Sequence, residues 1–211
     1  MKITWSRIVP LLAALLLILA GWIGGPQNPA DFASVAEATK IRSHDPLWTT
    51  APAILTQFGS AYFLMPVSAL VVLILYFADR RRSALLLFVT IAGERLLLDG
   101  LKILVERPRP DLDEHVVMTH SFSFPSGHAA NTMTVFVAIA LFALPKRHRF
   151  WSIPVAIALA AVVAATRPWL GVHWPSDIVG GWMLAALSIS AALWAQKRFR
   201  LTDPQPSRKA T

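Results

Sequence analysis

Cysteine is absent from this sequence of 211 residues, and charged side chains are scarce. Without cysteine the chain can form no disulfide framework, no thiolate zinc site and no cysteine nucleophile. Charged residues make up 15% of the sequence, against about a quarter in soluble domains. Hydrophobic residues make up 55% and the mean hydropathy is +0.52. The composition therefore predicts a membrane protein, built as one compact bundle.

The net charge of +8 does not indicate a nucleic-acid partner. Binding to nucleic acid requires basic residues gathered on one solvated face. Here most of them lie in short clusters between apolar runs. The expected environment is the lipid bilayer, with no nucleic acid involved.

Apolar runs of about the length that crosses a bilayer core predict an all-α bundle of six transmembrane helices. They cover Ile8–Gly25, Ile54–Phe77, Ser83–Val105, Gly127–Leu144, Phe150–Ala165 and Asp177–Gln196. A short helix is expected around Ala30–Lys40, in the first polar loop. A cleaved signal peptide is the alternative for the first run, although the nearest cleavage-like triplet lies well beyond it. We expect a membrane domain over residues 1–196 and a basic, disordered tail over residues 197–211.

The distribution of basic residues predicts the orientation of this bundle. Six spans place both termini on one side, and most of the 20 basic residues fall on that side: Lys2, Arg7, Arg80, Arg81, Arg82, Lys146, Arg147, Arg149, Lys197, Arg198, Arg200, Arg208 and Lys209. The positive-inside rule makes that side cytoplasmic. The polar clusters at the opposite ends of the spans then face away from the cytoplasm.

The first polar cluster belongs to the third run, which contains Glu94, Arg95, Asp99 and Lys102. Ionisable groups at this depth are costly, so they should pair or face a wet interior. For Glu94, Arg95 and Asp99, an ion-pair ladder that only fixes helix packing is as good an interpretation as a functional one. Lys102 differs, because Arg109 follows it by seven residues. A lysine point charge and an arginine fork suit phosphate oxygens.

The second cluster is Pro125-Ser126-Gly127-His128, at the start of the fourth run. Serine is a favoured N-cap, and glycine lets the backbone approach a ligand closely. Free N–H groups and the helix dipole make such an end an anion site, within reach of His128. Taken alone, these residues also fit an ordinary helix start.

The third cluster comprises Thr166, Arg167, His173 and Asp177. If the turn before Asp177 is helical, His173 and Asp177 lie on one face. The carboxylate would then fix the imidazole tautomer and activate the ring as a nucleophile. Alternatives are a satisfied interfacial histidine with a capping aspartate, or zinc on His128, His173 and Asp177. The nearby cations would repel a dication, so we expect no metal and no cofactor.

Together the three clusters resemble the signature of the type-2 phosphatidic acid phosphatase and vanadium haloperoxidase superfamily. The family pattern is Lys-x6-Arg-Pro, then Pro-Ser-Gly-His, then Ser-Arg-x5-His-x3-Asp. The matching stretch runs from Lys102 to Asp177, a little over a third of the chain. Thr166 replaces the family serine but keeps its hydroxyl.

The resemblance implies a role for each matched residue. His173 would attack phosphorus to form a phosphohistidine, Asp177 would orient it, and His128 would protonate the leaving oxygen. The phosphate would be held without magnesium by Lys102, Arg109, Arg167 and the amides of Ser126 and Gly127.

Small six-span members of this family resemble bacterial lipid phosphatases that act on undecaprenyl diphosphate, phosphatidic acid or phosphatidylglycerol phosphate. The resemblance therefore predicts a lipid phosphatase in a bacterial inner (plasma) membrane, with its site facing the periplasm. Two alternatives stay open: a lipid phosphotransferase using the same residues, and a transporter or anion-binding protein using the charged third span. Haloperoxidase activity suits larger, soluble members.

Overall fold

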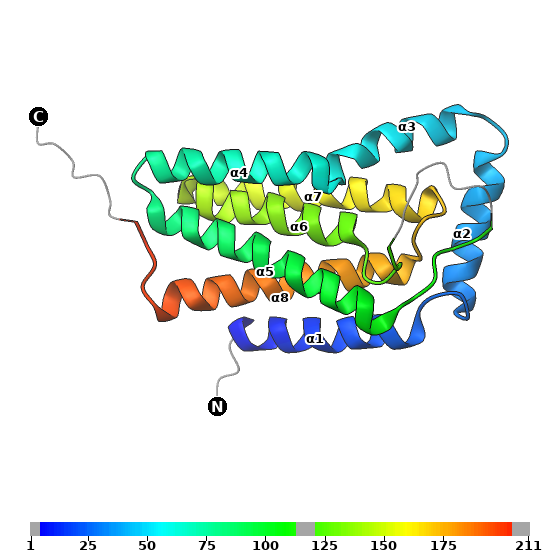
Figure 1. The fold of residues 1–211 in the computed structure, drawn as a ribbon, viewed down its shortest axis with the longest axis horizontal. Helices are drawn as coiled ribbons and strands as arrows, with labels where there is room; N and C mark the ends of the chain where they lie inside the picture. Colours follow the sequence, from blue (N-terminus) through cyan, green and yellow to red (C-terminus); the bar gives the residue numbers. More distant parts are fainter. Residues whose placement is uncertain (1–4, 113–120, 204–211) are drawn as a thin grey trace, which may run out of the picture.

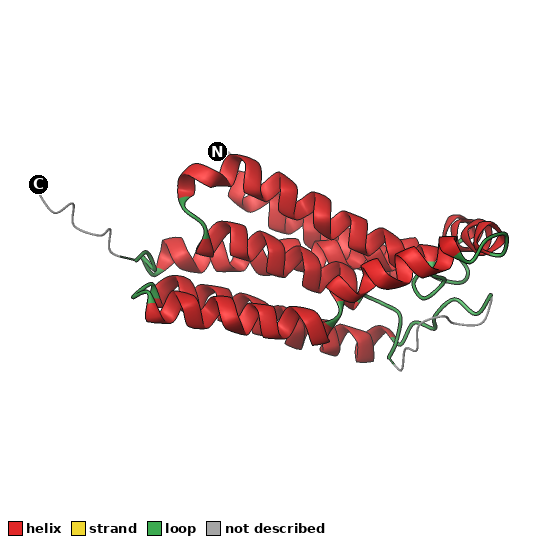
Figure 2. Ribbon diagram, turned by 90° about the horizontal axis from the view of Figure 1, so that it is seen from above, coloured by secondary structure: helices red, strands yellow, loops and turns green. Residues whose placement is uncertain are grey.

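The structure, a computed structural model, describes residues 5–112 and 121–203, and these residues form helices and loops without a strand. The α-helices are α1 (Trp5–Ile23), α2 (Pro29–Arg42), α3 (Leu47–Thr56), α4 (Ala61–Phe77), α5 (Arg81–Val105), α6 (Gly127–Ala138), α7 (Arg149–Trp169) and α8 (Pro175–Arg198). Helices α1 and α4 to α8 run side by side, and α2 crosses one end of this bundle (Figure 1). In the perpendicular view α2 is seen nearly end-on (Figure 2). The all-helical prediction is confirmed for the described residues.

The predicted short helix in the first polar loop is confirmed as α2. Asn28 caps it, since its Oδ1 accepts hydrogen bonds from the N–H groups of Ala30 at 2.9 Å and Asp31 at 3.1 Å. Pro29 occupies the first helical position, where the missing N–H costs nothing. The sequence thus encodes the start of α2 locally, and α2 closes the end of the bundle that carries the polar clusters (Figure 1).

The predicted second span is interrupted in the structure. Helix α3 passes into a 3₁₀ turn at Gln57–Gly59, and Ser60 caps the start of α4 by accepting the N–H of Phe63 at 3.2 Å. A side chain at Gly59 would meet Val163 Cγ1 at 2.5 Å and His128 Cδ2 at 2.9 Å. The bend therefore occurs where α4 approaches α6 and α7 closely, a tertiary constraint that hydropathy does not reveal.

Helix α7 is longer than predicted, because it continues through Pro168 to Trp169. A proline in the last turn of a helix removes only the one hydrogen bond that its missing N–H would have donated. Hydrogen bonds from Leu170 N to Thr166 O (2.9 Å) and from Val172 N to Arg167 O (3.1 Å) then end the helix. The loop before α8 is correspondingly shorter than the predicted range 166–176.

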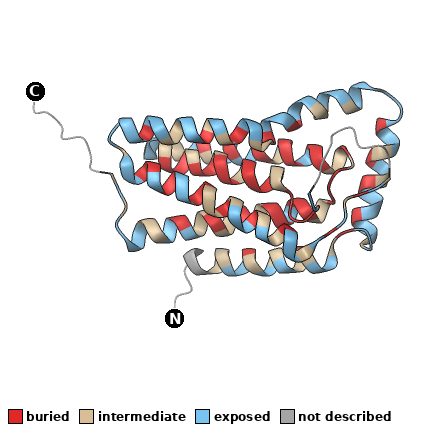
Figure 3. Cartoon of the chain, in the orientation of Figure 1, coloured by how far each residue is buried: buried red, intermediate tan, exposed pale blue. Residues whose placement is uncertain are grey.

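By length and hydropathy, three described stretches could cross a membrane: Leu47–Phe77, Lys146–Trp169 and Pro175–Arg198. Ile8–Ile23 and Gly127–Ala143 are shorter apolar helices. Helix α5 has 25 residues but carries the ionisable residues noted above. Buried residues face the inside of the bundle and exposed ones its periphery (Figure 3). Many exposed side chains are large and apolar, such as Leu96 and Leu104 on α5, as expected for a surface in contact with lipid tails.

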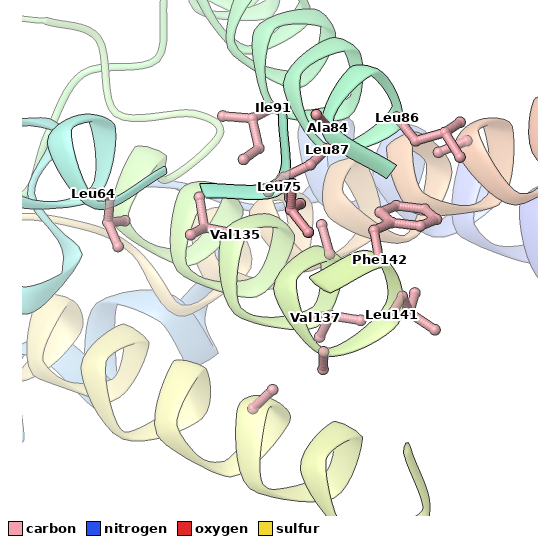
Figure 4. Packing of buried hydrophobic residues seen from close by; sticks show 14 residues of the cluster. Leu64, Leu75, Ala84, Leu86, Leu87, Ile91, Val135, Val137, Leu141 and Phe142 are labelled. Atoms are coloured by element: carbon pink, nitrogen blue, oxygen red, sulfur yellow. The ribbon is translucent and has the colours of Figure 1, made fainter. Parts of the chain in front are cut away.

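The largest apolar core lies in the half of the bundle away from α2. Leu87 of α5, Val135 of α6 and the π-helical turn Ile139–Ala143 meet there (Figure 4). At the end of that turn, Arg80 donates hydrogen bonds to the carbonyl oxygens of Phe142 (2.7 Å) and Ala143 (2.5 Å). Arg149 donates to the carbonyl oxygen of Leu141 in the same turn. Apolar packing and these arginine hydrogen bonds thus hold this half together.

The chain beyond α8 returns to the bundle before the described residues end. Asp203 accepts the N–H groups of Arg82 at 3.0 Å and Ser83 at 3.3 Å, at the start of α5. The predicted tail begins at residue 197, but α8 extends to Arg198. Residues 204–211 of that tail lie outside the described part of the chain.

Candidate active site

A cavity of about 200 Å³ opens in the polar half of the bundle, near α2. Six of the predicted site residues line it, from α5, α6, α7 and two loops: Lys102, Arg109, Gly127, His128, Arg167 and His173. Lys102 lies near the end of α5, His128 in the first turn of α6 and Arg167 in the last turn of α7. The structure therefore brings all three sequence clusters to one place.

His173 is almost fully enclosed, with 2% of its surface exposed. Its Nδ1 lies 3.2 Å from Asp177 Oδ2, and its Nε2 lies 3.1 Å from Arg109 Nη1. Arginine can only donate, so Nε2 carries the lone pair and Nδ1 the proton. Burial lowers the pKa of His173 well below its usual 6.5, and the nearby Arg109 and Arg167 lower it further. The imidazole is thus neutral, with its lone pair at the cavity.

Asp177, which is fully buried, positions this imidazole. Its Oδ2 also accepts the N–H of Trp174 at 2.9 Å and the hydroxyl of Ser123 at 2.5 Å. Asp177 stands in the first turn of α8, whereas His173 lies in the loop before it. The segment that carries His173 is not helical, so the condition for a shared helical face is not met: the aspartate caps the start of α8 and reaches the histidine from there.

Arg107 was missed by reasoning from the sequence, and it holds the other oxygen of Asp177. Its Nη1 lies 2.7 Å from Asp177 Oδ1, and its Nη2 donates to the carbonyl oxygens of Ala20 (2.7 Å) and Gly21 (2.8 Å) in α1. The guanidinium lies 4.4 Å from the ring centroid of Phe124. The only signal in the sequence was its place beside the Arg109 motif, which says nothing of a partner seventy residues away.

Main-chain oxygens hold two of the three predicted phosphate-binding cations at the cavity. Lys102 Nζ donates to Phe122 O at 2.5 Å, and Arg109 donates to Ser121 O at 2.8 Å and Val172 O at 2.6 Å. Each cation is thereby oriented by a loop carbonyl, and no described carboxylate forms an ion pair with either of them.

Arg167 is the deepest of the three cations, with 1% of its surface exposed. Its Nη1 donates to Thr56 Oγ1 at 2.8 Å, while its Nε has no hydrogen-bond partner among the described residues. A buried guanidinium with an open donor is costly unless an anion satisfies it. The arrangement favours an anionic ligand in the cavity.

Ser126 caps α6 as predicted, since its Oγ accepts the N–H of Ala129 at 3.5 Å. Its own N–H donates to Asp177 O at 3.0 Å. That bond takes the amide that we expected to bind phosphate, so Ser126 holds α6 to α8, while Gly127 lines the cavity.

Helix α2 fixes the start of α8 from outside. Asp31 accepts the N–H of Ser176 at 3.0 Å, the Ser176 hydroxyl at 2.5 Å and the N–H of Gly25 at 2.6 Å. Arg42, at the other end of α2, donates to the carbonyl oxygen of Trp169. Two buried charged residues thus fasten α2 across the ends of α7 and α8, and neither was predicted.

Two other predicted charges lie on α5. Arg95 Nε and Asp99 Oδ2 form an ion pair at 3.0 Å, and both residues line the cavity. Glu94 is 1% exposed, and its carboxylate oxygens have no partner among the described residues. Within the described ranges, no three His, Asp or Glu side chains converge as a metal site. Residues 115 and 120, two further histidines, lie outside those ranges.

Comparison with known proteins identifies the family. Residues 83–201 match the PAP2 superfamily. The chain is 35% identical to phosphatidylglycerophosphatase B of Bacillus subtilis over 63% of this chain and 68% of the relative. It is 29% identical to an undecaprenyl-diphosphatase of Sulfolobus acidocaldarius over 85% of each. The crystal structure of a transmembrane PAP2 type phosphatidylglycerolphosphate phosphatase from Bacillus subtilis superposes with a TM-score of 0.83 at 29% identity, covering 91% of this chain and 98% of that one. The expected resemblance is confirmed: the chain is a multi-pass membrane protein of the PAP2 superfamily.

Proposed function

We propose that this protein is a lipid phosphatase that removes a terminal phosphate through a phosphohistidine on His173. The observation that carries the proposal is the orientation of that imidazole: Nδ1 is held by Asp177 at 3.2 Å and Nε2 lies at a cavity with Arg109 at 3.1 Å. A neutral ring with its lone pair among cations is an activated nucleophile beside an anion site.

In the first step, the His173 Nε2 lone pair attacks the phosphorus atom and the bond to the lipid oxygen breaks. His128, protonated once the anionic phosphate occupies the cavity, gives its proton to that oxygen, so the lipid leaves as an alcohol or as a lipid monophosphate. Lys102, Arg109 and Arg167 stabilise the charge on the phosphoryl oxygens, because they are fixed before the reaction begins.

In the second step, water attacks the phosphohistidine. His128, now neutral, takes a proton from that water while the P–N bond breaks, and inorganic phosphate leaves. The Nδ1 proton remains on His173 throughout, shared with Asp177. The three cations stabilise the negative charge on the phosphoryl oxygens in both steps. The proposed reaction therefore needs no metal ion.

The setting of the cavity supports a lipid substrate. A second cavity, of about 610 Å³, adjoins the first and shares Asp99, Lys102, Arg109 and Ser121 with it. Its other lining includes Ile103, Pro108 and Phe122. A cavity in which these apolar side chains adjoin the cations would let the head of a lipid reach the cations while its tail lies against the apolar side chains.

We further propose six spans, with α3 and α4 together forming the second, and a site that faces the periplasm of a bacterial inner membrane. The positive clusters at residues 80–82 and 146–149 lie at the end of the bundle opposite α2, which the positive-inside rule places in the cytoplasm. A reporter fused after Gln196 should be cytoplasmic. A periplasmic reporter would reverse the orientation.

Phosphate release from purified protein in detergent tests the activity, with undecaprenyl diphosphate, phosphatidic acid and phosphatidylglycerol phosphate as substrates. We expect free inorganic phosphate, in excess EDTA as well as without it, and turnover lower by several orders of magnitude in His173→Ala. A newly phosphorylated lipid in place of free phosphate would indicate a phosphotransferase. Activity lost to EDTA and restored by magnesium would contradict the metal-free mechanism, and no hydrolysis at all would favour a transporter.

A further inference from the structure

Asp31 is a buried carboxylate on α2 that the proposed reaction does not use. It is 5% exposed and occupies the third position of the helix. Its oxygens accept three hydrogen bonds: from the N–H of Gly25 at 2.6 Å, from the N–H of Ser176 at 3.0 Å and from the Ser176 hydroxyl at 2.5 Å. All three partners are donors, which matches an ionised carboxylate because that group only accepts.

The Ser176 hydroxyl connects Asp31 to Arg107. It donates its proton to Asp31 Oδ2 and accepts a hydrogen bond from Arg107 Nη1 at 2.9 Å. Both directions are fixed, because arginine only donates and a carboxylate only accepts. The hydroxyl has one proton, so Asp31 determines that a lone pair of Ser176 faces the guanidinium.

Arg107 continues this chain of hydrogen bonds to the residue that orients the nucleophile. Of the two protons on Arg107 Nη1, one goes to Ser176 Oγ at 2.9 Å and the other to Asp177 Oδ1 at 2.7 Å. The other oxygen of Asp177 lies 3.2 Å from His173 Nδ1. A continuous hydrogen-bond chain therefore runs from α2 to the imidazole.

This hydrogen-bond chain is enclosed by the fold. Arg107 is 4% exposed and Asp177 is fully buried. A β-carbon added at Gly24 would overlap the Ser176 hydroxyl, so the main chain between α1 and α2 lies directly against that hydroxyl. In such surroundings water screens charges poorly, and hydrogen bonds in series strengthen one another. A change at one end of the chain should therefore be felt at the other.

We propose that Asp31 is a positioning residue for the nucleophile His173. By fixing the Ser176 hydroxyl, it holds the Arg107 guanidinium in the rotation that keeps Asp177 directed at the imidazole. Asp31 itself contacts neither the imidazole nor the cavity. The inference rests on the proposed phosphatase function and adds to it a residue of α2, which lies outside the three sequence clusters.

Two single variants interrupt the chain at different links. Asp31→Asn places an N–H group where the carboxylate accepted a hydrogen bond, and Ser176→Ala removes the hydroxyl. In each variant kcat for phosphate release should fall about tenfold, as for other lost partners of catalytic ligands. KM should stay within about twofold, because the phosphate-binding cations Lys102, Arg109 and Arg167 are not part of the chain. The assay uses whichever of the three lipids named above the wild type cleaves fastest.

The double variant distinguishes one chain from two separate effects. If Asp31 acts through Ser176, combining Asp31→Asn with Ser176→Ala should leave kcat about tenfold below the wild type, whereas independent effects would multiply to about a hundredfold. A hundredfold loss would overturn the proposal, and so would single variants whose kcat stays within about twofold. A higher KM at unchanged kcat would also overturn it, since α2 would then only cover the cavity.

The matched control is Arg42→Gln, at the other end of α2. Arg42 donates to the carbonyl oxygen of Trp169, so this variant loosens the same helix without changing the hydrogen-bond chain. Its unfolding temperature should fall, while the kcat of the folded protein should stay within about twofold of the wild type. An equal loss of kcat in Arg42→Gln and Asp31→Asn would assign the effect to the release of α2 and overturn the positioning role.

Ser176→Ala keeps the proposal testable if Asp31→Asn does not fold. It leaves the charge of Asp31 and its hydrogen bonds to main-chain N–H groups in place, and the same criteria for kcat and KM apply to it. A wild type that releases no phosphate from any of the lipids would overturn the phosphatase function and the positioning role with it. An active wild type whose variants keep its kcat would overturn the positioning role alone.

Discussion

The two halves of this bundle are held together by different forces. In the half away from α2, buried Leu, Val, Ile, Ala and Phe side chains pack in one apolar cluster. In the half near α2, buried charged groups connect segments far apart in the sequence, as Arg107 does with Asp177 and with the carbonyl oxygens of α1. In the apolar half, directional hydrogen bonds such as those of Arg80 to Phe142 O and Ala143 O lie at the end of the bundle. In the polar half they fix the atoms around the cavity.

The difference matters because apolar packing is non-directional, whereas hydrogen bonds set distance and angle. A bilayer also weakens the advantage of burying apolar side chains, since lipid tails are as apolar as the core. The apolar half should therefore tolerate substitution better than the polar half. Measurements on matched variants of the two halves can challenge or refine that expectation.

The largest effect is expected for Arg107→Gln. It leaves Asp177 buried without its cation, which costs about 3–5 kcal/mol when a buried pair is broken, and it frees the carboxylate that orients His173. Turnover should fall about 10–100-fold, as for lost partners of catalytic ligands. Thermal unfolding and phosphate release in detergent measure both, with Arg81→Gln as the exposed control. If Arg107→Gln matched Arg81→Gln in stability and in turnover, the Arg107–Asp177 pair would not be what holds the polar half together.

A smaller effect is expected for Leu87→Ala in the apolar half. Leu87 is fully buried and lies fifteen residues before Lys102 on α5, about 22 Å along the helix. The cavity left behind should lower the unfolding free energy by about 2–3 kcal/mol. Turnover of the folded protein should stay within about twofold of the wild type. A large loss of turnover without unfolding would show that the halves are mechanically coupled.

The buried imidazole also predicts how stability depends on pH. Burial lowers the pKa of His173 in the folded protein, so below pH 6.5 the unfolded chain takes up a proton that the folded chain refuses. Stability is therefore lost as pH falls below about 6.5, by up to about 1.4 kcal/mol per pH unit. Between pH 7 and pH 5, the unfolding temperature should fall less steeply with decreasing pH in His173→Gln than in the wild type. Parallel curves for the two proteins would contradict the neutral imidazole.

The smallest effect is expected for Thr166→Ser, the one departure from the family pattern. The Thr166 hydroxyl donates to Val163 O at 2.6 Å within α7, and serine would keep that bond. Loss of one buried methyl group should cost about 1 kcal/mol, and phosphate release should stay within about twofold. A change beyond tenfold would mean that this hydroxyl contacts the substrate.

The motifs and most helix starts were predictable because they depend on local chemistry. Ser126 caps α6, and the Asn28-Pro29 pair starts α2, through bonds that span a few residues. The bend at Gly59 and the pairing of Arg107 with Asp177 were not predictable, since each depends on segments that meet only in the folded bundle. The contact of His173 with Asp177 was anticipated on the condition of a helical turn and is made from a loop instead, because one-dimensional spacing cannot distinguish a helical face from a capped loop.

The closeness of Gly59 to His128 limits how the protein can be redesigned. A single added carbon at position 59 would collide with the imidazole at 2.9 Å and with α7 at 2.5 Å, so position 59 accepts no side chain. On α5, Arg95 and Asp99 line the cavity with side chains that are 42% and 49% exposed, and these two positions have room to change. Engineers who want the protein to accept bulkier head groups should therefore vary positions 95 and 99 and leave Lys102 and the α3–α4 junction as they are.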